Sequence, residues 1–338
     1  MARFSKYDVI GKIMEIGLIP IFYEGEIEIA KKIAQACYNG GAKVIEFANR
    51  GNFAHQVFIE LEKWAAIKLP DLILGAGSVI DPATAALYIN NGANFIVGPI
   101  FNLEVAKICN RRKIVYSPGC GTVSEISEAE EIGLDIIKIF PCGAVGPNFI
   151  REILGPCPWV RLMPTGGVNA TRESVNEWIK GGAACLGIGS KLIRKSMVKS
   201  GNFEGITKKT EQVIWWIKEA RGIPLFIGIE HVGIQTEQST GAEIAEWYSE
   251  TFGFDTKMEG YSPFFISGKE KGGLEIIGKS KPMSYHVAIQ VSNFEEACKY
   301  LENRGIAIEE PEINKNTKVV YLKNSDPAGN RVNLFYKV

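Results

Sequence analysis

The sequence predicts an α/β protein in which a (β/α)₈ TIM barrel is followed by an α+β domain of paired βαβββ modules. Three observations lead to this prediction. From residue 18 onward, eight short apolar runs alternate with segments of helical period. The pattern changes after Arg221-Gly222-Ile223-Pro224, and the strand-rich remainder consists of two similar halves. We therefore expect a barrel over residues 1–222 and a second domain over 226–338.

Length and composition narrow the class of protein. The chain has 338 residues, of which 46% are hydrophobic, enough for two domains with cores of ordinary size. Its 38 basic and 38 acidic residues cancel, so we expect neither nucleic acid nor an anionic membrane as a partner. No signal peptide or membrane-spanning run is present, and we expect a cytoplasmic protein. Seven scattered cysteines without CxxC pairs favour reduced thiols over structural zinc or disulfides.

The barrel prediction depends on eight apolar strands. Nearly continuous apolar strands separated by helices are typical of a parallel sheet buried on both faces. An open doubly wound sheet has the same periodicity, but the count of eight favours a closed barrel. We expect helices near 26–39, 52–66 and 82–91. The predicted strands lie at residues 19–22, 43–47, 72–77, 95–99, 113–119, 135–141, 160–167 and 184–189.

A second domain is predicted after the helix containing VIWWIKEA, because Gly222 and Pro224 are residues that close helices and begin linkers. Helices are expected at about 240–252 and 293–304. The segment IEHVGIQ…AEWYSETFGF aligns loosely with SYHVAIQ…ACKYLENRGI, which indicates an internal duplication. The expected strands are 229–236, 263–268, 273–278, 285–291, 319–324 and 330–336.

Polar residues at the ends of the barrel strands are the candidate site residues, because the active sites of such barrels lie at the C-terminal ends of the strands. Lys138 interrupts the apolar run DIIKIFP, and Glu46 interrupts VIEF. Either charge alone could be a rim side chain or half of an ion pair. A buried amine and a carboxylate that face one cavity are, however, what imine formation and aldol cleavage require.

Anion-binding features accompany this pair. The turns TGG (165–167) and GIGS (187–190) follow the seventh and eighth strands, where barrels of this kind bind phosphate through backbone N–H groups. Tight glycine turns also have a purely steric explanation. Arg50 could hold a carboxylate through two hydrogen bonds, or it could form an ordinary rim ion pair. Ser78 in GAGS is a further candidate.

Six motifs resemble, in order and spacing, those of the KDPG/KHG aldolase family: IEFANR, GAGSVIDP, SPGCGTVSE, IKIFPCGAVG, MPTGG and LGIGSKL. The resemblance covers residues 5–220. It implies a class I aldolase that needs no cofactor and assembles as a homotrimer. The implied substrates are small keto acids: 2-keto-3-deoxy-6-phosphogluconate, cleaved to pyruvate and glyceraldehyde 3-phosphate, and 4-hydroxy-2-oxoglutarate, cleaved to pyruvate and glyoxylate.

The resemblance also implies roles for individual residues. Lys138 matches the Schiff-base lysine, and Glu46 the general acid and base. The residues implied to hold the pyruvate-derived part are Arg50, Ser78, Phe140 and Thr165, and those implied to hold phosphate are Gly166, Gly167, Gly189 and Ser190. The chain departs from the family pattern at Ala48, Ser78, Val97-Gly98-Pro99 and Cys142-Gly143, which bears on substrate preference more than on the chemistry.

Two of the three histidines, His231 and His286, occupy equivalent places in the two halves of the second domain, and Glu275 ends a strand between them. IEHVGIQ, YHVAIQV and DPAGNRVNLFY resemble the vicinal-oxygen-chelate (glyoxalase/bleomycin-resistance) superfamily, which implies a divalent metal on these three residues. Asn333 stands where the pattern has a glutamate, which weakens a site for such a metal. The alternative is a pair of hydrogen-bonded histidines without metal.

Two functions from different classes therefore compete. The first is a Schiff-base aldolase. The second is a barrel that binds a phosphorylated metabolite without lyase activity, with the C-terminal domain as a sensing or oligomerisation module.

Overall fold

The structure is a computed structural model that describes residues 2–235, 241–252, 255–258, 264–267, 273–277, 285–327 and 329–337. The chain divides into two compact units, Met1–Arg221 and Gly222–Val338. Among the described residues, the helices include none that is long and apolar enough to cross a membrane.

Parallel strands form the centre of the first unit. Each of the eight predicted apolar runs contains a strand, and Pro118 divides the fifth run into β5 and β6. One sheet has the order β5-β4-β3-β2-β1-β9, and a second has the order β6-β7-β8. The strands are β1 (Leu18–Phe22), β2 (Val44–Ala48), β3 (Ile73–Gly77), β4 (Phe95–Val97), β5 (Val115–Ser117), β6 (Gly119–Cys120), β7 (Ile137–Ile139), β8 (Leu162–Pro164) and β9 (Leu186–Ile188).

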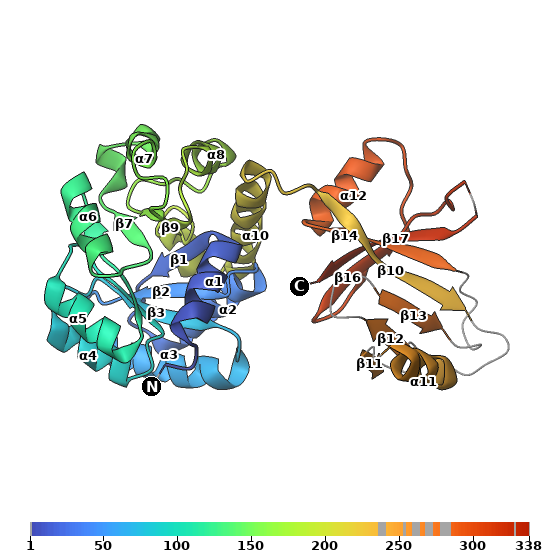
Figure 1. The fold of residues 1–338 in the computed structure, drawn as a ribbon, viewed down its shortest axis with the longest axis horizontal. Helices are drawn as coiled ribbons and strands as arrows, with labels where there is room; N and C mark the ends of the chain where they lie inside the picture. Colours follow the sequence, from blue (N-terminus) through green and yellow to red (C-terminus); the bar gives the residue numbers. More distant parts are fainter. Residues whose placement is uncertain are drawn as a thin grey trace. The chain divides into compact units, whose positions relative to one another are not determined.

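These sheets curl, and helices lie around their outside (Figure 1). A single parallel bridge between Thr165 and Gly187 connects the end of β8 to β9. Every residue of β2 and β3 is buried, as expected for strands covered on both faces. The parallel (β/α) architecture is thus observed, and full closure into an eight-stranded barrel stays a prediction.

The helices of this unit follow the strands in alternation. The expected helices near 26–39, 52–66 and 82–91 correspond to α2, α3 and α4. The helices are α1 (Lys6–Ile16), α2 (Ile27–Asn39), α3 (Ala54–Lys68), α4 (Pro82–Asn90), α5 (Leu103–Arg112), α6 (Val123–Glu131), the 3-10 turn η1 (Cys142–Ala144), α7 (Pro147–Leu154), α8 (Arg172–Lys180), α9 (Lys195–Lys199) and α10 (Phe203–Ala220).

The predicted alternation of strands and helices begins at residue 18, so α1 precedes every element that the sequence predicted. Its signals are nevertheless present. Ser5 and Asp8 form a capping box at the N-terminus of the helix, and Gly17 ends it with a φ of 74°. Buried Val9 and Ile13 join α1 to the same core as the strands.

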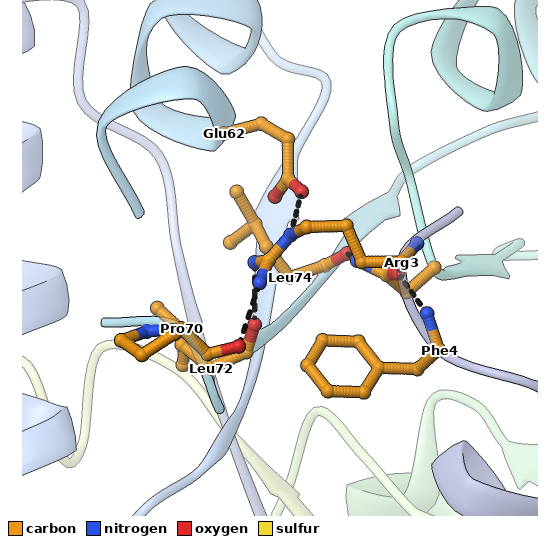
Figure 2. Close-up of polar contacts among 7 residues, drawn as sticks. Arg3, Phe4, Glu62, Pro70, Leu72 and Leu74 are labelled. Carbon is orange, nitrogen blue, oxygen red and sulfur yellow. Dashed lines mark hydrogen bonds and ion pairs between the residues drawn. The ribbon is translucent and has the colours of Figure 1, made fainter. Parts of the chain in front are cut away.

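The segment before α1 is fixed to the unit by an ion pair between half-buried Arg3 and buried Glu62. Figure 2 shows the guanidinium of Arg3 against Glu62 of α3 and the carbonyl oxygens before β3. Arg3 Nε donates to Glu62 Oε1 at 2.8 Å, and its terminal nitrogens donate to the carbonyls of Pro70 (2.8 Å) and Leu72 (2.7 Å). Glu62 is 6% exposed, and burial raises the pKa of its carboxyl while Arg3 lowers it.

Replacing Arg3 with methionine is expected to destabilise the protein by about 3–5 kcal/mol, because Glu62 keeps its burial and loses its counter-charge. In the variant, Glu62 binds a proton more tightly in the folded state than in the unfolded state. The free energy of unfolding therefore falls as pH rises above the ordinary glutamate pKa. Urea unfolding at pH 5 and pH 8 measures both effects. Lys63→Ala, which removes an exposed pair with Glu60, is the control and should cost about 1 kcal/mol or less.

The second unit is built on one mixed, eight-stranded sheet with the order β11-β12-β13-β10-β14-β17-β16-β15. The pairs β10–β13 and β14–β17 are parallel, and the other neighbours are antiparallel. Its elements, in chain order, are β10 (Phe226–Gln235), α11 (Gly241–Phe252), β11 (Asp255–Met258), β12 (Phe264–Ser267), β13 (Gly273–Ile277), β14 (His286–Val291), α12 (Phe294–Glu302), β15 (Glu312–Ile313), β16 (Thr317–Tyr321) and β17 (Arg331–Lys337).

The expected helices of this unit are found as α11 and α12. Each expected strand overlaps an observed strand. The predicted strand ends at 236, 263, 268 and 278, and the predicted helix start at 240, lie outside the described residues. The mixed sheet is therefore observed, while its interpretation as two copies of one module stays a prediction.

Candidate active site and metal centre

A cavity of about 800 Å³ lies where β1, β2, β7, β8 and β9 of the first unit end. The sequence-predicted residues converge here from segments far apart in the chain. Those that line the cavity are Glu46, Arg50, Lys138, Phe140, Thr165, Gly166, Gly167, Gly189 and Ser190. Ser78 does not line it, but its hydroxyl accepts a hydrogen bond from Arg50 Nε at 3.3 Å.

Lys138 lies at the middle of β7 with only 5% of its surface exposed, so it does not extend to solvent at the rim. Its backbone N–H donates to Pro118 O at 2.9 Å, and its Nζ lies 4.9 Å from the centre of the Phe140 ring. Burial lowers the pKa of Lys138, Glu46 raises it and Arg50 lowers it. The net effect is a lowered pKa, which makes the neutral amine, the form that attacks a carbonyl, easier to reach.

Glu46 is 2% exposed on β2, and its Oε2 has no hydrogen-bond partner among the described residues. Burial raises the pKa of this carboxyl, while Lys138 and Arg50 lower it. Gly77 on the neighbouring strand makes room for it, because a Cβ there would lie 1.8 Å from Glu46 Oε1. A carboxyl with a raised pKa beside an amine with a lowered pKa is suited to giving and taking protons.

Arg50 and Ser78 follow β2 and β3, where the parallel strands end at the same edge. Ser78 has a φ of 58°, in the left-handed region. Ser78 accepts a hydrogen bond from Arg50 Nε and does not line the cavity, so its contact with the cavity is through the guanidinium. Arg50 is the residue of this pair that is placed to meet an anion.

The two glycine turns bring backbone to the cavity wall. Gly166 has a φ of 81°, and a Cβ there would lie 2.9 Å from the Phe140 ring. A Cβ on Gly167 would lie 2.3 Å from the backbone nitrogen of Gly143, so this turn needs glycine sterically. Thr165 Oγ1 is buried without a hydrogen-bond partner among the described residues. The wall thus offers backbone N–H groups and a free hydroxyl to a ligand.

Sequence reasoning missed part of the lining. After β1, the lining includes Tyr23 and Glu24. After β9, it includes three lysines of the basic nine-residue stretch KLIRKSMVK: Lys191, Lys195 and Lys199. The signal that could have found them was the position of this stretch directly after the GIGS turn.

In the second unit, the three predicted ligands come together on one face of the sheet. Their donor atoms lie within 4.8 Å of one another. Glu275 Oε2 lies 3.1 Å from His286 Nε2 and 3.4 Å from His231 Nε2. Register explains the meeting, since Gly233 pairs with both Glu275 and His286, and its missing side chain leaves space for the His286 ring.

Asn333 faces the same side, because it is in register with Ala288, which is itself in register with His231. It is 2% exposed, and its Oδ1 has no hydrogen-bond partner among the described residues. Burial disfavours protonation of His231, but hydrogen bonds to Glu230 and Glu275 outweigh it and raise its pKa to about 9. Hydrogen bonds from both histidines outweigh burial at Glu275 and lower its pKa to about 2.

Comparison with known proteins gives matches to the first unit. A family model described as "Aldolase: KDPG and KHG aldolase" matches residues 9–209. The 2-dehydro-3-deoxy-phosphogluconate aldolase of Haemophilus influenzae is 27% identical over 64% of this chain and 99% of its own length. The KHG/KDPG aldolase of Escherichia coli K12 is 29% identical over 58% of this chain and 90% of its own.

A solved structure of KDPG aldolase from Legionella pneumophila, with pyruvate captured as a covalent carbinolamine, is similar at 28% identity and a TM-score of 0.54. It covers 60% of this chain and 97% of its own. Each of these matches covers under two thirds of the chain, and the family model ends at residue 209, within the first unit.

Proposed function

The chain belongs to the KDPG and KHG aldolase family over residues 9–209, and from this premise we propose that it is a class I aldolase in which Lys138 forms a Schiff base with a 2-keto acid. The observation that carries the proposal is the pairing of a buried lysine of lowered pKa with a buried glutamate of raised pKa in one cavity. Its substrates are 2-keto-3-deoxy-6-phosphogluconate, 4-hydroxy-2-oxoglutarate or both.

The reaction follows from these two side chains. The neutral amine of Lys138 adds to the C2 carbonyl of the keto acid, and the carbinolamine loses water to give an imine. Glu46 then removes the proton of the C4 hydroxyl as the C3–C4 bond breaks, so that an aldehyde leaves and an enamine remains. Protonation of the enamine at C3 and hydrolysis of the imine release pyruvate and regenerate the lysine.

Other lining residues fit the substrate's two anionic ends. Arg50, held by Ser78, is placed to bind the carboxylate of the keto acid, and Thr165 Oγ1 and the Phe140 ring line the same space. The turns at Gly166-Gly167 and Gly189-Ser190 offer backbone N–H groups to a phosphate.

Trapping with pyruvate and borohydride tests the proposal. Reduction should add a pyruvate-derived group to the peptide that contains Lys138, and Lys138→Ala should take up none; an adduct on another lysine would refute the assignment. A lactate dehydrogenase assay with each keto acid separates a lyase from a barrel that only binds phosphorylated metabolites, since only a lyase releases pyruvate.

For the second unit we propose a divalent metal on His231, Glu275 and His286. Two imidazoles and one carboxylate are a common donor set for such ions, and their donor atoms already meet. Buried Asn333 Oδ1, which lacks a partner among the described residues, is placed on the same face to complete the set with a neutral oxygen. When bound, a metal would supply Lewis acidity. The resemblance of this unit to the vicinal-oxygen-chelate superfamily agrees with the donor set.

Equilibrium dialysis of the full chain against Zn²⁺, Ni²⁺ or Mn²⁺, followed by elemental analysis, is expected to give close to one bound ion per chain. The His231→Ala/His286→Ala double variant should retain no metal. The control is His55→Ala, which removes the one histidine of the first unit and should bind metal as the wild type does. Equal and negligible metal in all three proteins would contradict the proposal and favour a binding or oligomerisation module.

We also propose a homotrimer formed through the first unit. Large apolar side chains are exposed around α4, α5 and α6, and Asn102 Nδ2 donates to Ile80 O at 3.1 Å between two of these segments. The exposed residues are Ile80, Leu87, Ile100, Leu103 and Val123. Light scattering should give three times the chain mass for the wild type and a lower mass for Ile100→Glu/Leu103→Glu. The exposed Ile67→Glu is the control, and an unchanged mass in the double variant would contradict this surface.

A further inference from the structure

The strand that carries His231 is irregular just before that residue. Ile229 of β10 is in register with Ile289 of β14. His231 is in register with Ala288, the next residue along β14, so Glu230 is paired with no residue of β14. One extra residue on one strand of an antiparallel pair is a β-bulge. A regular strand turns consecutive side chains to opposite faces, whereas this bulge lets Glu230 lie beside the His231 ring.

The carboxylate of Glu230 meets one nitrogen of that ring. Glu230 Oε2 lies within hydrogen-bond distance of His231 Nδ1. The Glu230 side chain is 26% exposed and the His231 side chain 4%, so the contact is largely shielded from water. The other nitrogen, His231 Nε2, lies 3.1 Å from His286 Nε2 and 3.4 Å from Glu275 Oε2. One ring therefore joins Glu230 to the three proposed metal ligands.

Metal binding requires one definite arrangement of this ring. Histidine binds a divalent ion through a nitrogen lone pair, so Nε2 must carry no proton and Nδ1 must carry one. The Glu230 carboxylate then accepts the Nδ1–H of His231, which fixes the tautomer and the orientation of the ring and makes Nε2 a stronger donor. His286 lacks this support within the described part of the chain, where its Nδ1 is buried without a hydrogen-bond partner.

Glu230 also changes the charge of the site. Two neutral imidazoles, the Glu275 carboxylate and the Asn333 amide together carry −1, so a divalent ion on these four groups would leave +1. Both histidines and Asn333 are buried, and a buried charge without a counter-charge is costly. The carboxylate of Glu230 supplies the second negative charge, and the loaded site becomes neutral.

We propose that Glu230 is a positioning residue of a divalent-metal centre in the second unit. It fixes the tautomer of His231, and it supplies from outside the ligand set the negative charge that Asn333 does not provide. The proposal rests on the metal site proposed above for His231, Glu275 and His286. It adds to that site a residue that the resemblance of this unit does not assign.

The test measures the Kd of the full chain for Zn²⁺ by competition with a chromophoric chelator. Glu230→Gln keeps an oxygen that can accept the N–H but loses the charge, and it should weaken binding about tenfold. Glu230→Met loses both the acceptor and the charge, and it should weaken binding about 100-fold. Glu310→Gln makes the same charge change at an exposed glutamate of this unit and should alter the Kd less than about twofold.

A spectroscopic measurement separates positioning from a purely structural role. In the Co²⁺-loaded wild type, the Nδ1–H of His231 should give a paramagnetically shifted proton NMR signal that exchanges slowly with water, because Glu230 accepts this hydrogen bond. In Glu230→Met that signal should exchange faster, while the signal of the His286 ring stays unchanged. Circular dichroism of each metal-free variant should match the wild type, which shows that the variants fold.

A second substitution tests the role of charge. Asn333→Glu returns a carboxylate to the ligand set, so it should gain more Zn²⁺ affinity in the Glu230→Gln protein than in the wild type, where Glu230 already balances the ion. Equal gains in the two proteins would overturn the charge compensation.

The remaining outcomes distinguish this proposal from the metal site itself. Wild-type affinity in both Glu230 variants, with binding lost in His231→Ala/His286→Ala, would overturn the role of Glu230 alone. Weaker binding with unchanged exchange of the His231 proton would overturn positioning. A wild type that binds no metal would overturn the site and the role of Glu230 together.

Discussion

Lys138→Ala is expected to lower kcat for keto-acid cleavage by at least about 10⁴-fold, because the residue supplies the covalent step that no neighbouring group can replace. The other lysines of the cavity are exposed and lie beyond the glycine turns. A lactate dehydrogenase-coupled assay of pyruvate release measures the loss with each keto acid.

Folding is not expected to suffer in this variant. Lys138 is a buried amine with no described carboxylate at ion-pair distance, so its removal relieves a desolvation cost. Thermal unfolding should therefore occur at or above the wild-type temperature, and Lys138→Met provides a second variant of similar volume. Pyruvate release above a tenth of the wild-type rate by either folded variant would contradict covalent catalysis at this position.

Glu46→Gln is expected to lower kcat by about 10²- to 10⁴-fold, the usual contribution of a positioned general acid and base. Glutamine keeps the shape of a side chain that fits against Gly77, but its amide is neither an acid nor a base near neutral pH. Glu24→Gln, at the other carboxylate of the cavity lining, is the matched control and should change kcat less than about threefold. Comparable losses in both variants would remove Glu46 from its assigned role.

The same variant makes a signed prediction about pH. Imine formation needs the neutral amine, and burial already lowers the pKa of Lys138 below its ordinary value of 10.5. Glu46 raises that pKa, so its removal lowers it further. The pH dependence of borohydride trapping should therefore move to lower pH in Glu46→Gln than in the wild type. An unchanged pH profile would show that the two side chains do not interact, and a shift to higher pH would contradict the predicted sign.

Much of this architecture could be predicted because burial selects residue type directly. A parallel strand covered on both faces must be apolar throughout, so Lys138 and Glu46 were conspicuous as charges inside such runs. His231 and His286 could be paired because they occupy matching positions in two similar segments. These signals lie within short stretches of chain.

Other features depend on contacts between distant segments. Arg3 meets Glu62 across 59 positions, and neither residue is conspicuous alone. The sequence predicts Ser78 as a ligand of the substrate, and the hydrogen bond that Ser78 accepts from Arg50 depends on how two strand ends meet. Gly77 gives room to Glu46, and Gly233 to His286, each from a neighbouring strand. No local pattern reveals which side chain a missing Cβ accommodates.

The sequence by itself determined the chain's parallel (β/α) unit, its change of architecture near residue 222, and the two charges inside apolar strands, Lys138 and Glu46, because hydrophobic periodicity and its interruption by a charge are local properties. Only the tertiary structure decided that nine predicted residues share one cavity, that three lysines extend it, and that Asn333 faces the histidines with an unpaired oxygen. Those facts depend on sheet order, register and curvature, which set distances between residues that the chain keeps far apart.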